Sequence, residues 1–150
     1  MEKELKIEIL DRERVEKFLT DLPHVVISVR SSKDSPKAQL PDNPNRIAEL
    51  YLEFDDYDRQ WDEHIKLVTK EDAKAILGLI KITEPYINLI VINCDGGISR
   101  SSAIGAALSI LLKVPGGDKE YFNPRGPFIP NRLVYRTLLD CAIEEKWNVA

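Results

Sequence analysis

The sequence predicts an α/β fold: a single-domain, three-layer sandwich in which helices flank a central, mostly parallel sheet. Three observations support this prediction. The chain has 150 residues, the size of one compact domain, so residues 1–150 are taken as a single domain. Stretches typical of strands alternate with stretches typical of helices. Residues 88–92 (NLIVI) are apolar on both faces, the pattern of a strand that is covered on both sides.

The composition is that of a globular chain with no preference for nucleic acid or membranes. Hydrophobic residues make up 43% and charged residues 31%, and no apolar run approaches the roughly 20 residues of a spanning helix. The formal net charge of −4 provides no basic surface for nucleic acid or anionic lipid. The first residues lack a signal-peptide pattern, and two cysteines cannot build a disulfide scaffold. We therefore expect a cytoplasmic monomer with free thiols and with neither a nucleic-acid nor a membrane partner.

The beginning of the chain predicts two strands and one helix. Residues 5–9 (LKIEI) alternate apolar and charged side chains, as a half-buried edge strand does. Asp11 then offers an N-cap to a helix over residues 12–22, which Pro23 closes. Residues 24–29 (HVVISV) are apolar and β-branched, which predicts a second strand.

A surface loop separates this strand from the next. Residues 30–45 contain three prolines and few apolar side chains. Residues 46–54 (RIAELYLEF) end in a strand that stops at an acidic cluster, residues 55–58. Thr69 caps a predicted helix over residues 71–82, in which the apolar side chains follow helical spacing.

The second half of the chain predicts a central strand and two core helices. The strand at residues 88–92 is followed by residues 101–112, which are apolar nearly all round and predict a buried helix. A last helix over residues 131–146 follows Pro130. Four of its apolar side chains are expected to face the core: Leu133, Leu138, Leu139 and Ile143.

The loop between the central strand and the buried helix is a predicted anion site. In an open α/β sheet, ligands bind beyond the carboxyl ends of the strands, where the next helix presents unpaired backbone N–H groups. The adjacent Gly96 and Gly97 permit positive φ angles and a close approach of an oxyanion to the backbone. The expected phosphate-binding residues are Asp95, Gly96, Gly97, Ile98, Ser99 and Arg100.

Three residues of this loop have the chemistry of phosphoryl transfer. A cysteine thiolate is a strong nucleophile, and N–H groups, a helix N-terminus and a neighbouring arginine all favour the thiolate, so Cys94 is the predicted nucleophile. The planar guanidinium of Arg100 can hold two phosphoryl oxygens at once. Ser101 is placed either to hydrogen-bond the departing sulfur or to cap the helix, and the two roles are compatible.

Residues 94–101 (CDGGISRS) have the pattern Cys-x-x-Gly-x-x-Arg-Ser. This pattern resembles that of the cysteine-dependent protein tyrosine phosphatases, and especially the dual-specificity branch. Residues 52–58 (LEFDDYD) and 130–139 look like segments of small bacterial members of that family, so the resemblance spans roughly residues 46 to 140. It implies hydrolysis of phosphomonoesters through a cysteinyl-phosphate.

The resemblance also implies a general acid that protonates the leaving oxygen, and it places this acid at Asp56. Asp58 is the second choice, and Asp55 and Asp62 are also available. At least two of the four are expected to be solvated turn residues. The family usually has histidine immediately before the cysteine, whereas this chain has Asn93. The substitution allows a slower enzyme or a pseudophosphatase that only binds phosphorylated segments.

The remaining candidates predict no further chemistry. His24 and His64 have no second ligand at metal spacing, so neither a metal nor another cofactor is expected. Cys141 lies among apolar residues and is expected to be a buried structural thiol. The expected partner is a phosphorylated protein or peptide, carrying phosphotyrosine or phosphoserine and phosphothreonine. Sulfur transfer of the rhodanese type is the third hypothesis, and the positions of Arg100 and Ser101 argue against it.

Overall fold

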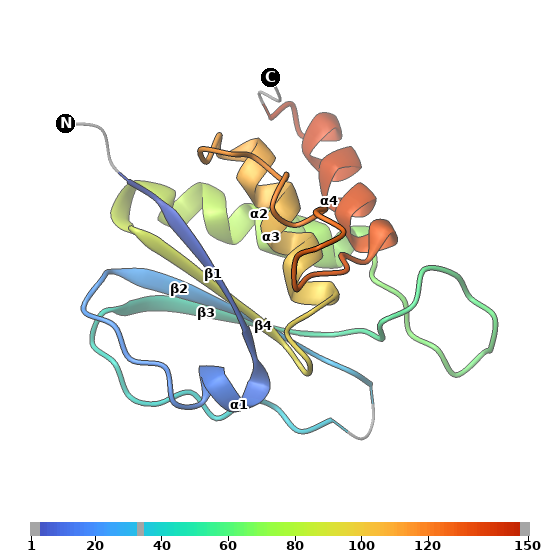
Figure 1. Ribbon diagram of the computed structural model, residues 1–150, viewed down its shortest axis with the longest axis horizontal. Coiled ribbons are helices and arrows are strands. Elements are labelled where there is room, and N and C mark those ends of the chain that lie inside the picture. The colour runs from blue at the N-terminus through green and yellow to red at the C-terminus, as the bar shows by residue number, and fades with distance from the viewer. Residues whose placement is uncertain (1–3, 33–34, 148–150) are drawn as a thin grey trace.

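The computed structural model of the protein describes residues 4–32 and 35–147. Its four strands form one sheet in the order β1-β4-β2-β3, and all three neighbouring pairs are parallel. The strands are β1 (Lys6–Asp11), β2 (His24–Arg30), β3 (Arg46–Glu53) and β4 (Leu89–Cys94). The predicted parallel sheet is therefore confirmed, with the first strand at an edge and the apolar strand in the centre (Figure 1).

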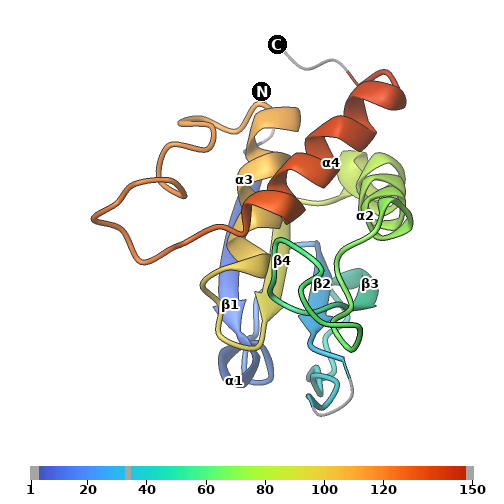
Figure 2. The same cartoon turned by 90° about the vertical axis from the view of Figure 1, so that its right-hand side faces the viewer.

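Three helices lie together on one face of the sheet (Figures 1 and 2). They are α2 (Lys70–Thr83), α3 (Arg100–Leu111) and α4 (Arg132–Glu144), and the short 3₁₀ helix η1 (Glu84–Tyr86) follows α2. The remaining helix, α1 (Arg12–Val15), has a single turn and follows β1. Within the described ranges, no helix combines the length and the apolar character needed to cross a membrane.

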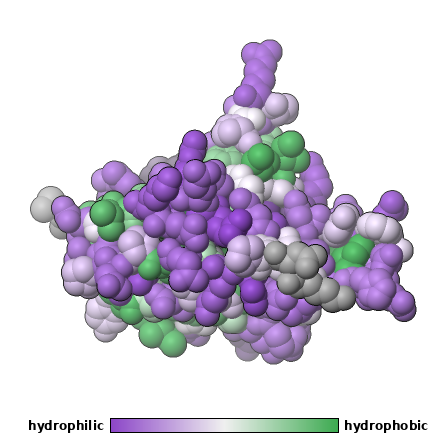
Figure 3. Space-filling view, turned by 90° about the horizontal axis from the view of Figure 1, so that it is seen from below, coloured by the Kyte–Doolittle hydropathy of each residue, from purple (hydrophilic) through white to green (hydrophobic). Residues whose placement is uncertain are grey.

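Each face of the sheet packs against its own apolar core. Alternate residues of β4 point to opposite faces, so Ile90 and Ile92 join the core under α2, α3 and α4. Val91 points the other way and packs in a smaller core with Val15 and Phe18. The outer surface on that side is mainly hydrophilic, with apolar residues only in scattered spots (Figure 3). The central strand is buried on both sides, as its sequence predicts.

The first helix is shorter than the sequence predicts, because the residues after Val15 bond to another segment. The carboxylate of Glu16 accepts a hydrogen bond from the Gln39 backbone N–H at 2.8 Å. The carbonyl of Thr20 accepts one from the side chain of Asn43 at 3.1 Å. These contacts hold residues 16–20 against the β2–β3 connection. Beyond Val15, the backbone N–H groups of Lys17 and Phe18 bond only to the carbonyls three residues earlier, which forms turns rather than a continued α-helix.

The last helix begins as predicted, and three of the four apolar side chains expected at the core lie there: Leu138 is buried, and Leu133 and Leu139 are partly buried and pack against it. The side chain of Asn131 caps it by accepting a hydrogen bond from the Val134 N–H at 3.1 Å. Leu138 and Cys141 are buried, whereas Ile143 is 63% exposed. At 3.6 residues per turn, the stripe that begins at Val134 passes through residues 138 and 141, and Ile143 lies outside it. The prediction of a core position for Ile143 is wrong, and that of a buried Cys141 is confirmed.

We expect Ile92→Ala to lower the free energy of unfolding by about 2–5 kcal/mol, because it leaves a cavity in a close-packed core. Ile92 is fully buried in β4. The matched control is Ile82→Ala on α2, whose side chain is 73% exposed and whose loss should cost no more than about 0.5 kcal/mol. Urea denaturation followed by circular dichroism measures both values. Equal losses would contradict the assignment of β4 to the centre of the core.

Candidate active site

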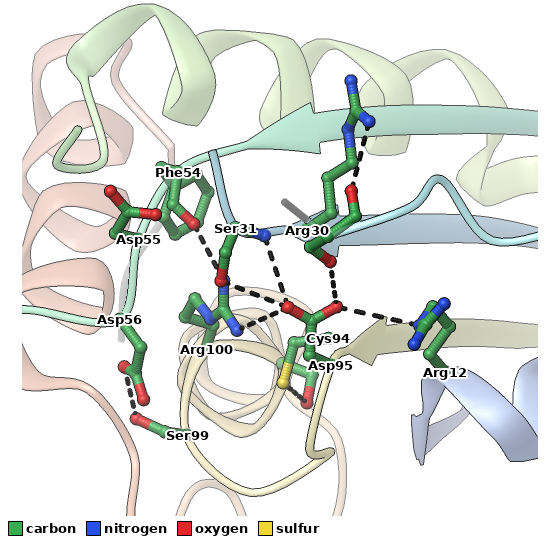
Figure 4. Close-up of polar contacts among 12 residues, drawn as sticks. Arg12, Arg30, Ser31, Phe54, Asp55, Asp56, Cys94, Asp95, Ser99 and Arg100 are labelled. Carbon is green, nitrogen blue, oxygen red and sulfur yellow. Dashed lines mark hydrogen bonds and ion pairs between the residues drawn. The ribbon is translucent and has the colours of Figure 1, made fainter. Parts of the chain in front are cut away.

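The carboxyl ends of the parallel strands meet at one edge of the sheet, and the predicted site lies there. Cys94 is the last residue of β4, and Arg100 is the first residue of α3. Between them lies the cysteine–arginine loop, residues 94–100. Ser31 and Phe54 directly follow β2 and β3 and lie beside Arg100 (Figure 4).

The backbone of the cysteine–arginine loop uses its carbonyl groups to hold neighbouring segments. The Asp95 carbonyl accepts from the Arg12 N–H at 3.4 Å, and the Ile98 carbonyl accepts from the Ile129 N–H at 3.1 Å. The Gly97 N–H lies 3.2 Å from the Cys94 Sγ. Four other N–H groups of the loop donate to no described residue: those of Asp95, Gly96, Ile98 and Ser99. A row of free donors beside a thiol is the arrangement that binds an oxyanion.

Gly97 is required at its position in this loop. Its φ is +66°, in the left-handed region, and a Cβ there would lie 2.7 Å from the Asp11 backbone nitrogen and 2.8 Å from the Leu10 carbonyl carbon. The loop therefore packs directly on the end of β1. Gly96 has no positive φ, and a Cβ on it would meet no atom within 4 Å. Of the two glycines, only Gly97 needs the conformational freedom that the sequence suggested for both.

Cys94 and Ser101 are buried and in contact. The Cys94 Sγ lies 3.1 Å from the Ser101 Oγ, and both residues are nearly inaccessible to solvent. Ser101 is the second residue of α3, and Ser99 occupies the N-cap position. The capping role that the sequence left open for Ser101 is therefore wrong, and its hydroxyl instead faces the sulfur.

The Arg100 guanidinium is buried at the back of the site, with the residue only 5% exposed. Its Nη1 donates to the Phe54 carbonyl at 2.8 Å and to the Ser31 Oγ at 3.0 Å. Its Nη2 lies 3.5 Å from the Asp95 carboxylate. The Nε has no hydrogen-bond partner among the described residues. The Arg100 Nε and the loop N–H groups that donate to no described residue are all hydrogen-bond donors. Donors gathered in this way can bind an anion.

The structure separates the four candidate acids. Asp56 faces the same pocket as Cys94, and its Oδ1 accepts from the Ser99 Oγ at 2.8 Å and from the Asn131 side chain at 2.9 Å. Asp58 lines the adjacent pocket, without Cys94. Asp62 accepts from the His64 N–H on the exposed loop.

Asp55 points away from the pocket and anchors two loops. Its carboxylate accepts from the Ser32 N–H and hydroxyl and from the Lys66 N–H, all between 2.9 and 3.0 Å. Burial raises the pKa of Asp55, but these hydrogen bonds and the charge of Arg100 outweigh it, so the pKa is lowered overall. Asp55 therefore behaves as a structural carboxylate.

The site opens as a pocket of about 350 Å³. Ile98 and Ile129 form exposed apolar walls, 47% and 74% accessible. The lining residues are Asp56, Cys94, Gly96, Ile98, Ser99, Arg100 and Ile129. In the described part of the chain, no cluster of three His, Cys, Asp or Glu side chains could hold a metal ion.

Asn93, which precedes the cysteine, makes no side-chain hydrogen bond to the described residues of the loop. It is 1% exposed in β4, and its Oδ1 has no hydrogen-bond partner among the described residues. The loop is held instead by Arg12, Ile129 and the Asn131 N–H, which donate to its carbonyls.

Sequence reasoning missed four contributors to the site: Ser31, the Phe54 carbonyl, Asn131 and the side-chain role of Asp95. Ser31 and Phe54 carried one usable signal. Each directly follows a strand of the parallel sheet, so each had to lie at the same edge as Cys94.

The parallel sheet and the cysteine–arginine loop after its central strand give the chain the fold of the dual-specificity phosphatases. The structure is similar to the crystal structure of human DUSP28, a dual-specificity phosphatase, with a TM-score of 0.59 and 15% sequence identity over 93% of each chain. No family model matches the sequence, and no curated protein matches it either. The resemblance to bacterial members stays a prediction.

The carboxylates of Asp55 and Asp95 should make the fold sensitive to acid. Burial raises the pKa of Asp95, but hydrogen bonds from Ser35 and Ser31 and the charge of Arg100 lower it overall. A lowered pKa in the folded state gives stability above the unfolded pKa of about 3.9, which is lost as pH falls through the folded value. We expect the free energy of unfolding, measured with urea, to fall steeply below about pH 4.

The control for this prediction is Asp55→Asn, which cannot titrate. The variant should be less stable at neutral pH, and its stability should fall less between neutral pH and pH 3 than that of the wild type, because one of the two titrating groups is gone. An identical acid profile for the variant would contradict the role of Asp55.

Proposed function

We propose that the protein hydrolyses phosphomonoesters of phosphorylated proteins or peptides through a cysteinyl-phosphate intermediate. The observation that carries the proposal is the buried guanidinium of Arg100, whose Nε has no described partner. It lies in one pocket with Cys94, the first residue of a loop in which four backbone N–H groups donate to no described residue. The fold of human DUSP28 supports the same class of reaction. No metal or other cofactor has a role in the proposed chemistry.

In the first step, the Cys94 thiolate attacks phosphorus. An S–P bond forms as the P–O bond to the leaving group breaks. The loop N–H groups and Arg100 bind the three equatorial oxygens, over which the negative charge is spread in the transition state. Asp56 donates a proton to the leaving oxygen, and its contacts with Ser99 and Asn131 hold the carboxyl group over the pocket.

In the second step, water hydrolyses the intermediate. The Asp56 carboxylate accepts a proton as a water oxygen attacks phosphorus, and the S–P bond breaks. The departing sulfur gains negative charge, which the Ser101 hydroxyl at 3.1 Å and the Gly97 N–H at 3.2 Å can stabilise. Inorganic phosphate leaves and the thiolate is restored.

The walls of the pocket support a protein substrate. Ile98 and Ile129 can pack against the stem or ring of a phosphorylated side chain while its phosphoryl group reaches the loop. The loop contains no lysine, which weighs against an inositol-lipid headgroup with several phosphates. A phosphorylated peptide therefore fits the site best.

Cys94→Ser should abolish turnover of 4-nitrophenyl phosphate, because a serine hydroxyl does not ionise near neutral pH. The variant should still bind vanadate, because the N–H groups and Arg100 remain. The matched control is Cys141→Ser on α4, which should keep wild-type activity. Turnover by Cys94→Ser would exclude the mechanism. Vanadate or phosphopeptide binding by a wild type without turnover would favour the pseudophosphatase.

Asp56→Asn should slow hydrolysis of phosphotyrosine peptides by about 10²- to 10⁴-fold, because tyrosine leaves poorly without a proton. The loss on 4-nitrophenyl phosphate should be much smaller, because nitrophenolate needs little protonation. Steady-state kcat/KM on both substrates measures the difference. Asp58→Asn and Asp62→Asn are the controls, and a leaving-group dependence in either would move the acid to that residue.

A further inference from the structure

The Asp95 carboxylate joins three segments that are far apart in the sequence. Its Oδ1 accepts from the Ser35 hydroxyl at 2.7 Å and lies 4.0 Å from the Arg12 Nε. Its Oδ2 accepts from the Ser31 hydroxyl at 3.1 Å and N–H at 3.4 Å, and lies 3.5 Å from the Arg100 Nη2. Figure 4 shows this carboxylate between Arg12 and Arg100, turned away from Asp56 and Ser99.

The described contacts of Arg100 use both hydrogens of Nη1 and one hydrogen of Nη2. The group has five N–H bonds. Both hydrogens of Nη1 have acceptors, the Phe54 carbonyl and the Ser31 hydroxyl, and one hydrogen of Nη2 faces Asp95. Ser31 and Asp95 bond to each other, so they lie side by side along the Nη1–Nη2 edge.

The opposite edge is left for a ligand. The Nε–H and the second Nη2 hydrogen lie parallel on this edge, and the Nε has no described partner. Two parallel N–H donors match two oxygens of a phosphoryl group. The direction of this edge depends on what holds the Nη1–Nη2 edge, because a guanidinium can otherwise rotate about its side-chain bonds.

We propose that Asp95 is a positioning residue for Arg100. Its carboxylate contacts Ser35 and Arg12 through one oxygen and Ser31 and Arg100 through the other. Together with the Ser31 hydroxyl, it fixes the Nη1–Nη2 edge of the guanidinium. The Nε–Nη2 edge then faces the phosphoryl group. This inference rests on the proposed phosphatase function. It assigns to the side chain of Asp95 a role distinct from that of its backbone N–H in the loop.

The charge of Asp95 makes positioning distinguishable from a simple electrostatic effect. A carboxylate near a phosphoryl dianion opposes its binding, so removal of the charge alone would strengthen anion binding and leave kcat intact. Loss of orientation instead removes an interaction that is strongest in the transition state, which lowers kcat.

The test is Asp95→Asn, with Ser31→Ala as its partner. An asparagine has one acceptor oxygen, so it cannot accept from both the Ser35 side and the Ser31–Arg100 side. We expect each variant to lower kcat on 4-nitrophenyl phosphate by about tenfold or more, with KM within about threefold of wild type. The double variant should lose little more than either single variant, because both changes break the same bridge.

The matched control is Glu16→Ala, which removes the acceptor of the Gln39 N–H in the same β2–β3 connection without touching Arg100. Its kcat should stay within about twofold of wild type, since surface contacts of this kind contribute little. The proposal would be overturned by an unchanged kcat in Asp95→Asn or by losses that multiply in the double variant. A loss in Glu16→Ala equal to that in Asp95→Asn would overturn it as well.

A second readout does not depend on turnover. In nitrogen-15 NMR spectra, the Arg100 Nε–H signal, assigned by its absence in Arg100→Lys, should shift as inorganic phosphate is added to the wild type. In Asp95→Asn the shift should be lost or much reduced, and an unchanged shift would overturn the proposal. A wild type that shows this shift but no turnover would refute the proposed hydrolysis and leave the positioning role standing.

Discussion

The site depends on one buried cation. Arg100 begins α3, yet its guanidinium reaches under the ends of β2 and β3, where the Phe54 carbonyl and Ser31 accept its hydrogen bonds. A buried charge is tolerated only when it is paired and hydrogen-bonded. The guanidinium of Arg100 therefore needs acceptors, and the residues that follow β2 and β3 supply them. The carboxyl edge of the sheet is therefore organised around the Arg100 guanidinium, whose Nε has no partner among the described residues.

The close approach of the cysteine–arginine loop to β1 completes this arrangement. Gly97 packs so near Leu10 and Asp11 that any side chain would collide with their backbone. The loop carbonyls of Asp95, Ile98 and Ser99 accept hydrogen bonds from the backbone N–H groups of Arg12, Ile129 and Asn131. The loop is thus held through its carbonyls, whereas four of its own N–H groups donate to no described residue.

Much of the fold and the centre of the site could be predicted from the sequence, because local rules govern them. The apolar pattern of residues 88–92 predicted the central strand, and the placement of Ser101 just after the loop that begins at Cys94 predicted the contact of its hydroxyl with the sulfur. The contact of Ser31 with Arg100 joins residues 69 apart in the sequence. The sequence indicates that Ser31 lies at the same edge of the sheet as Cys94, but its contact with Arg100 also depends on strand order, which no local pattern encodes.

The same distinction explains the errors. Residues 16–22 have a sequence compatible with a helix, but the Glu16 carboxylate and the Thr20 carbonyl bond to the β2–β3 connection, a tertiary effect that outweighs a weak local preference. Ile143 is apolar, but the direction of α4 is set by the stripe that runs from Val134 through Leu138 to Cys141. Apolar character alone does not say which face of a helix is buried.

The balance of charge at the site explains why a chain with a net charge of −4 can be suited to a dianion. Asp95 offsets much of the charge of Arg100 when the pocket is empty, which reduces the cost of burying the guanidinium. In the proposed reaction, the phosphoryl group meets both Arg100 and N–H dipoles, and the dipoles carry no net charge and need no reorganisation during the reaction. Recognition of phosphoryl oxygens in that reaction thus depends on the geometry of the loop and of Arg100, and we assign the setting of that geometry to the same carboxylate that weakens the local field.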